Sequence, residues 1–122
     1  MRLKLLRERF SVCKIARTEQ IPFAETFVFV GKTDAEFSLV CREEAVPQGR
    51  LAEEPGWRCF CVEGPLDFSL VGILAELSGT LAAEGVSLFA VSTFDTDYLL
   101  VREDALPKAR AALERAGHTC GE

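Results

Sequence analysis

Short apolar runs separated by charged or Gly/Pro segments recur along the whole chain. The runs are rich in aromatic and β-branched residues, which favour strands over helices. They predict strands at 9–15, 27–32, 37–42, 57–62, 86–93 and 98–102.

Two longer segments carry apolar residues at helical spacing instead. The first, 68–84, has Asp67 in position for an N-cap and Gly85 just past its end. The second, 104–116, stops before Gly117. The second half of the chain is therefore predicted to run strand, helix, strand, strand, helix.

The chain also aligns with itself at an offset of about 60 residues. The run LVCREEAVPQGR from Leu39 matches LLVREDALPKAR from Leu99, and Thr33 then meets Thr93. We interpret this as a tandem duplication. The first copy is the shorter one, with its helices reduced to about 18–26 and 45–54.

A strand-helix-strand-strand-helix-strand unit with one helix-free sheet face is typical of the ferredoxin-like split β-α-β arrangement. We predict an α+β fold of tandem ferredoxin-like modules with antiparallel sheets, an abbreviated N-terminal module at 1–60 and a C-terminal module at 61–122. Two full copies need eight strands. Segments 2–6 and 118–121 must supply edge strands, or one copy is incomplete; the N-terminal segment can also cross over to the second sheet.

Composition and charge limit the classes of function. The chain has 122 residues, 48% of them hydrophobic and 27% charged, as expected of a globular protein. Its net charge of -5 argues against nucleic acids and anionic membranes as partners. No apolar run approaches the roughly 20 residues of a membrane span, and charges interrupt the N-terminal run, so we expect a cytoplasmic protein.

The sequence has few of the residues and motifs that are typical of catalytic and metal sites. Five cysteines lie mostly inside apolar runs, which predicts reduced, buried thiols. Cys59 and Cys61 share one face of a strand, but with one histidine and no C-x-x-C motif we expect no metal and no cofactor. No Ser-His-acid set or phosphate-binding glycine loop is present, so we predict that the protein is not an enzyme.

The predicted topology brings three loops to one end of the second module. These are the strand-to-helix connection at 63–67, the hairpin at 94–97 and the approach to the last strand at 117–118. The N-terminus of the first helix offers backbone N–H groups to a carboxylate. Gly72 leaves room for a ligand there, and Ser69 adds a hydroxyl donor.

Across this gap, Thr93, Asp95, Thr96 and Asp97 can bind an ammonium group. An anion site opposite carboxylates suits a small zwitterion such as an amino acid. The alternatives are that the two acids solvate a hairpin tip and that Asp67 only caps the helix.

The motifs EGPLDFSLVGIL and FAVSTFDTDYLLV, followed by REDAL, resemble the small ACT-domain proteins of the CASTOR type. The resemblance covers about 9–118. It implies a tandem pair of ACT modules that bind amino acids at an interface between modules and regulate another protein. With the topology, it predicts a ligand site made of Asp67, Ser69, Gly72, Thr93, Phe94, Thr96 and Asp97.

We therefore predict a regulatory protein that senses an amino acid or a similar small zwitterion. The best-known members of the family carry two such pairs of modules, so a homodimer would recreate their arrangement. The alternative is a protein-protein interaction module that pairs through exposed sheet edges and binds no metabolite.

Overall fold

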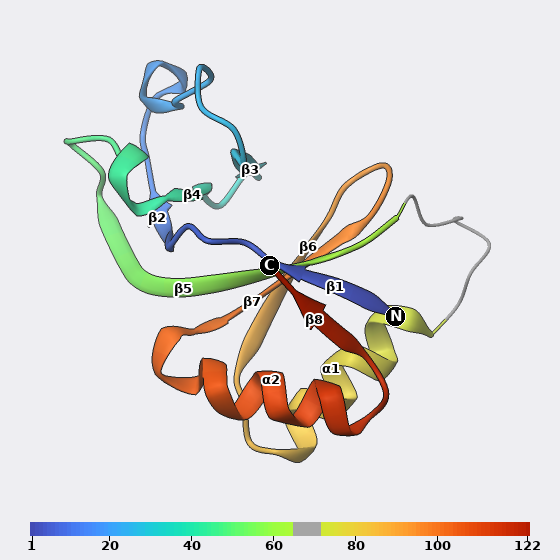
Figure 1. The fold of residues 1–122 in the computed structure, drawn as a ribbon. Helices are drawn as coiled ribbons and strands as arrows, with labels where there is room; N and C mark the ends of the chain where they lie inside the picture. The colour runs from blue at the N-terminus through green and yellow to red at the C-terminus, as the bar shows by residue number, and fades with distance from the viewer. Residues whose placement is uncertain (65–71) are drawn as a thin grey trace. The chain divides into compact units, whose positions relative to one another are not determined.

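The computed structural model describes residues 1–64 and 72–122 and has an α+β fold (Figure 1). These residues form two compact units. Met1–Arg7 and Arg58–Glu122 make up one, here called the helical unit, and Glu8–Trp57 make up the other, the small unit. Strand β5 (Ala52–Val62) contributes its first part to the small unit and its last part to the helical unit.

The helical unit contains five strands and two helices among the described residues. They are β1 (Arg2–Leu5), the end of β5, α1 (Ile73–Ala83), β6 (Leu88–Ser92), β7 (Asp97–Arg102), α2 (Leu106–Arg115) and β8 (Thr119–Gly121). The strand order is β6-β7-β5-β1-β8. From β5 to β8 the chain runs strand, helix, strand, strand, helix, strand, which confirms the predicted α+β fold class.

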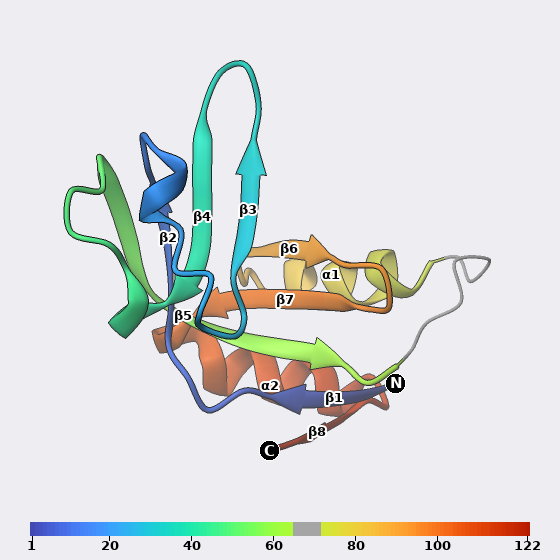
Figure 2. The ribbon, with the colours of Figure 1, turned by 90° about the horizontal axis from the view of Figure 1, so that it is seen from above.

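Both helices of this unit pack on the same face of its strands (Figures 1 and 2). Phe60 and Val62 of β5 alternate along the strand and bury their side chains completely, as period-two burial requires. Leu77 and Leu81 of α1 and Leu113 of α2 cover them in one cluster. Each such burial stabilises the fold by roughly 1.5–3 kcal/mol.

Strand β1 is inserted between β5 and β8. It runs antiparallel to β5, where Leu3 pairs with Val62, and parallel to β8, where Arg2 pairs with Thr119. Leu3 and Leu5 are buried in the helical core. The N-terminal segment therefore crosses over to the second sheet, as one of the two alternatives predicted. The β1–β8 pair is parallel within this otherwise antiparallel group of strands, because β1 and β8 both run opposite to β5.

The small unit is built from four strands. They are β2 (Phe10–Lys14), β3 (Phe29–Lys32), β4 (Phe37–Arg42) and the first part of β5, in the order β3-β4-β2-β5. Its core holds Cys13, Ile15, Ile21, Leu39 and Cys41. All five cysteines of the chain are free and four are buried.

The helices predicted in the small unit are wrong. Segment 18–26 forms only the 3-10 turn Thr18–Gln20, and the second segment is preceded by the 3-10 turn Glu43–Ala45. Gly49, with φ of 79°, interrupts the expected helix at 45–54. Its last residues belong to β5 instead, because they pair with β2.

The β3–β4 and β6–β7 hairpins share one geometry at an offset of 60 residues. Val30 pairs with Leu39 in the first, and Ala90 pairs with Leu99 in the second. A 3-10 turn follows each hairpin, Glu43–Ala45 and Glu103–Ala105. This repeat is what a duplication predicts, while the division at 1–60 and 61–122 stays a prediction.

Helix α1 begins at Ile73, with Gly72 as its N-cap. The predicted start at 68 and the predicted cap Asp67 lie outside the described residues. Gly72 has a left-handed φ of 83°, and a Cβ built on it would meet nothing within 4 Å in the described part of the chain. The backbone conformation therefore accounts for the glycine without any close neighbour.

The left-handed conformation of Gly72 predicts that two Gly→Ala substitutions will have opposite effects on stability. Gly72→Ala should lower the free energy of unfolding by about 1–2 kcal/mol, because alanine is strained at this φ. Gly79→Ala, inside α1 with open space at its Cβ, should instead raise it by about 1 kcal/mol. Urea denaturation of both variants measures the difference, and equal effects would show that Gly72 does not hold this conformation in solution.

A second prediction concerns alkaline pH. Burial raises the pKa of the Cys41 thiol from 9.0 to about 12, with Cys13 and Glu53 adding to the rise. Below pH 9.0 the Cys41 thiol is protonated in both the folded and the unfolded chain, and its contribution to the free energy of unfolding is complete. Above pH 9.0 the unfolded chain loses the thiol proton, while the folded chain keeps it. The free energy of unfolding should therefore fall by about 1 kcal/mol per pH unit in this window.

Urea denaturation between about pH 8 and pH 11 measures this slope. The Cys41→Ala variant should show a shallower fall with pH than the parent chain. The same slope in both proteins would mean that Cys41 does not contribute.

Candidate functional site

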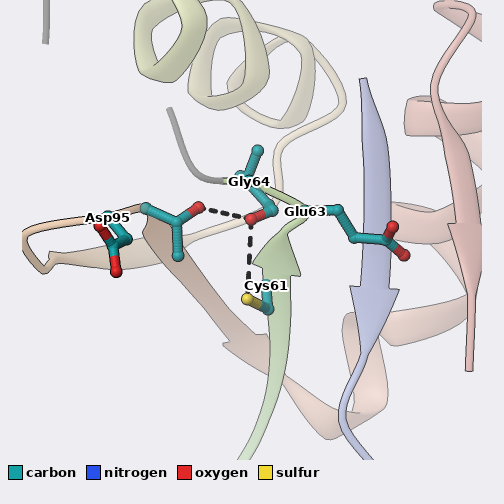
Figure 3. Close-up of a pocket in the computed structure, with 6 residues that line it drawn as sticks. Cys61, Glu63, Gly64 and Asp95 are labelled. Carbon is teal, nitrogen blue, oxygen red and sulfur yellow. Dashed lines mark hydrogen bonds between the residues drawn. The ribbon is translucent and has the colours of Figure 1, made fainter. Parts of the chain in front are cut away.

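A cavity of about 320 Å³ lies at the end of β5 in the helical unit. One wall is made by Cys61, Val62, Glu63 and Gly64, at the end of β5 and just beyond it (Figure 3). Asp95 and Thr96, in the turn between β6 and β7, make the other wall. The volume suits a small metabolite.

The two walls are joined through one backbone oxygen. The Thr96 hydroxyl donates a hydrogen bond to the Val62 carbonyl, and the Cys61 thiol donates to the same oxygen at 3.7 Å (Figure 3). The turn between β6 and β7 is therefore fixed to the last residue of β5.

The two acidic residues that line the cavity, Glu63 and Asp95, have different surroundings. The Glu63 side chain points toward β1 and away from Asp95 (Figure 3). Its carboxylate lies 3.9 Å from the Arg2 guanidinium, in an exposed ion pair that contributes little to stability. Asp95 is exposed at the turn. Both acids line the cavity, one from each wall.

The Cys61 thiol is held in its neutral form. Burial raises its pKa, and a hydrogen bond with Tyr98 opposes part of that rise. Burial also raises the pKa of Tyr98 to about 12, with the nearby Cys61 adding to the effect. Both groups stay protonated at neutral pH, so Cys61 provides a polarisable wall and not a nucleophile.

The four ligand residues predicted in the hairpin lie close together, but they differ in their hydrogen bonds and in their exposure. Thr93 closes the turn: its backbone N–H donates to the Thr96 carbonyl at 2.8 Å and its hydroxyl donates to the same oxygen at 3.1 Å. Phe94 is 81% exposed at the tip. Asp97, the first residue of β7, accepts a hydrogen bond from the Ser92 hydroxyl at 2.6 Å. Of these four predicted residues, Thr96 lines the cavity.

The other three predicted residues come from the connection between β5 and α1. Asp67 and Ser69 lie outside the described residues, and Gly72 is the N-cap of α1. Sequence reasoning missed Cys61 and Glu63. The period-two pattern of β5 carried a signal for Cys61, because it faces away from the core positions Phe60 and Val62.

Within residues 1–64 and 72–122, no group of three or more His, Cys, Asp or Glu side chains is arranged to hold a metal ion. In the same part of the chain, no helix combines the length and the apolar character needed to cross a bilayer.

Comparison with known sequences identifies two segments. The profile of the ACT domain matches residues 52–115. A separate profile, of an N-terminal domain, matches residues 8–49. The first match includes β5, both helices and the β6–β7 hairpin.

Curated relatives include the human and bovine proteins named cytosolic arginine sensor for mTORC1 subunit 1. Each is 40% identical to this chain over 60 residues, which make up 48% of this chain and 18% of the relative. The matching segment thus spans less than a fifth of these relatives.

Solved structures are similar over nearly the whole chain. A protein from Agrobacterium tumefaciens is 38% identical, with a TM-score of 0.85 and coverage of 98% of this chain and 90% of the other. The regulatory subunit of aspartate kinase from Thermus thermophilus has a TM-score of 0.64 at 11% identity, with coverage of 94% and 96%, which shows a shared fold alone. Since the ACT-domain profile matches more than half of its residues, this chain belongs to the ACT-domain family.

Proposed function

We propose that this protein is a regulatory protein without enzymatic activity that senses an amino acid through its C-terminal ACT module, residues 61–122. The proposal rests on the cavity at the end of β5, because the volume between β5 and the β6–β7 turn suits a small ligand.

The groups around this cavity favour a ligand with a cationic end. Asp95 lies on the cavity wall, and Asp97 follows two residues later as the first residue of β7. Carboxylates bind ammonium and guanidinium groups through charge-assisted hydrogen bonds. The curated relatives are named arginine sensors, so L-arginine is the first amino acid to test.

The ligand's opposite end is assigned to the start of α1. Helix N-termini favour carboxylates, and Gly72 caps this one. Asp67, Ser69, Gly72, Thr93, Phe94, Thr96 and Asp97 remain the proposed ligand residues, with Cys61 and Asp95 added from the cavity.

The resemblance to the CASTOR type extends the proposal to the assembly. We place the ligand at an interface between ACT modules of a cytoplasmic homodimer that acts on a protein partner. The repeated hairpin geometry supports a tandem pair of modules.

One observation favours a second function, that of a protein-protein interaction module. Strand β6 pairs with β7 alone among the described strands, so its other edge is open to a strand from another protein. This function needs no metabolite.

A thermal-shift screen against the twenty amino acids separates the two functions. A ligand at a hundredfold excess over its Kd should stabilise the protein by about 2.7 kcal/mol, which raises the melting temperature by several degrees. A screen in which no amino acid, L-arginine included, raises it would leave only the interaction module.

Asp97→Ala should abolish the shift produced by the active amino acid. The fold should lose only about 1 kcal/mol, because the carboxylate accepts one exposed hydrogen bond from Ser92. Thermal unfolding with and without the amino acid measures both quantities.

The matched control is Ser92→Ala, which removes the same hydrogen bond but keeps the carboxylate. It should cost similar stability and retain the ligand shift. If Asp97→Ala fails to fold, or still binds as the parent does, Asp97 is not a ligand residue.

A further inference from the structure

The repeated hairpin provides an internal control for Thr96. In the first hairpin the corresponding residue is Glu36, yet the turn is the same. The Thr33 hydroxyl donates to the Glu36 carbonyl at 3.4 Å, as the Thr93 hydroxyl donates to the Thr96 carbonyl at 3.1 Å. The turn therefore requires the backbone carbonyl at this position and not a hydroxyl side chain.

The Thr96 hydroxyl is instead used outside its own hairpin. It donates to the Val62 carbonyl, at the last residue of β5. Val62 is fully buried and pairs with Leu3 of the inserted strand β1, so its backbone is held within the sheet. Glu36 has no hydroxyl to make such a bond.

This bond connects the two walls of the cavity. Thr96 and its neighbour Asp95 form one wall, and Val62 and the next two residues form part of the other. Fixing Thr96 on Val62 also fixes the carboxylates on either side of it, Asp95 and Asp97. Preorganised groups bind more tightly because less conformational entropy is lost on binding.

We propose that Thr96 is a positioning residue of the ligand cavity, which acts through the Val62 carbonyl to hold Asp95 and Asp97 in place. The inference rests on the proposed function, and it adds a positioning role to the ammonium-binding role assigned to Thr96 from the sequence. A hydroxyl that donates its single hydrogen to Val62 still has its oxygen lone pairs to accept a hydrogen bond from an ammonium group.

Three variants of the full chain test the assignment. Thr96→Val keeps the shape of the side chain without the donor, Thr96→Ser keeps the donor, and Glu36→Val changes the matched position of the first hairpin. Calorimetric titration with L-arginine should show about 5-fold weaker binding for Thr96→Val, the size expected for one neutral hydrogen bond. Thr96→Ser should restore binding to within about 2-fold, and Glu36→Val should leave it unchanged.

A second measurement reads the bond without any ligand. The Glu63 amide shares a peptide group with the Val62 carbonyl, so its NMR chemical shift responds to the hydrogen bond. The shift should change in Thr96→Val and return in Thr96→Ser, while both variants keep the folded spectrum elsewhere.

The outcomes distinguish the two proposals. Parent protein that binds none of the twenty amino acids contradicts the proposed function, and the Glu63 amide then still tests the bond. Thr96→Val that binds L-arginine as the parent does, or that leaves the Glu63 amide unmoved, overturns the positioning role.

Discussion

The pairing of β1 with the end of β5 is the constraint on which the candidate site depends. Leu3 and Leu5 are buried in the same core as Phe60 and Val62, and the Glu63 backbone N–H donates to the Arg2 carbonyl at 2.9 Å. A segment from the start of the chain thus fixes the last residues of β5. Without that anchor, the Val62 carbonyl would be a poor point of attachment for the hairpin turn.

The β3–β4 and β6–β7 hairpins have the same backbone geometry but carry different side chains. Thr33 and Thr93 close the same turn, and the registers of the paired strands are the same. The difference lies in the residues that follow, Glu36 and Phe37 in the first hairpin against Thr96 and Asp97 in the second. Only the second pair combines a donor for β5 with a carboxylate, so we assign the proposed ligand site to the second copy.

The sequence predicted those features that depend on local patterns. The strand at 37–42 has its predicted bounds, since charged residues bound its short apolar run on both sides. The segments at both ends of the chain also form strands, although β1 lies inside the sheet and only β8 is at an edge. The helices of the small unit were wrong because pairing with β2 outweighs the helical propensity of residues 52–54. The period-two pattern of β5 carried a signal for Cys61, but the Thr96–Val62 bond joins positions far apart in the chain, which no local pattern reveals.

We propose that an amino acid binds between the end of β5 and the β6–β7 turn. A crystal structure of the full chain grown with L-arginine, or with the amino acid most active in solution, would locate the ligand. We expect it between Gly64 and Asp95, with its cationic group on Asp95 or Asp97. An amino acid bound elsewhere on the chain, with this cavity left to solvent, would contradict it.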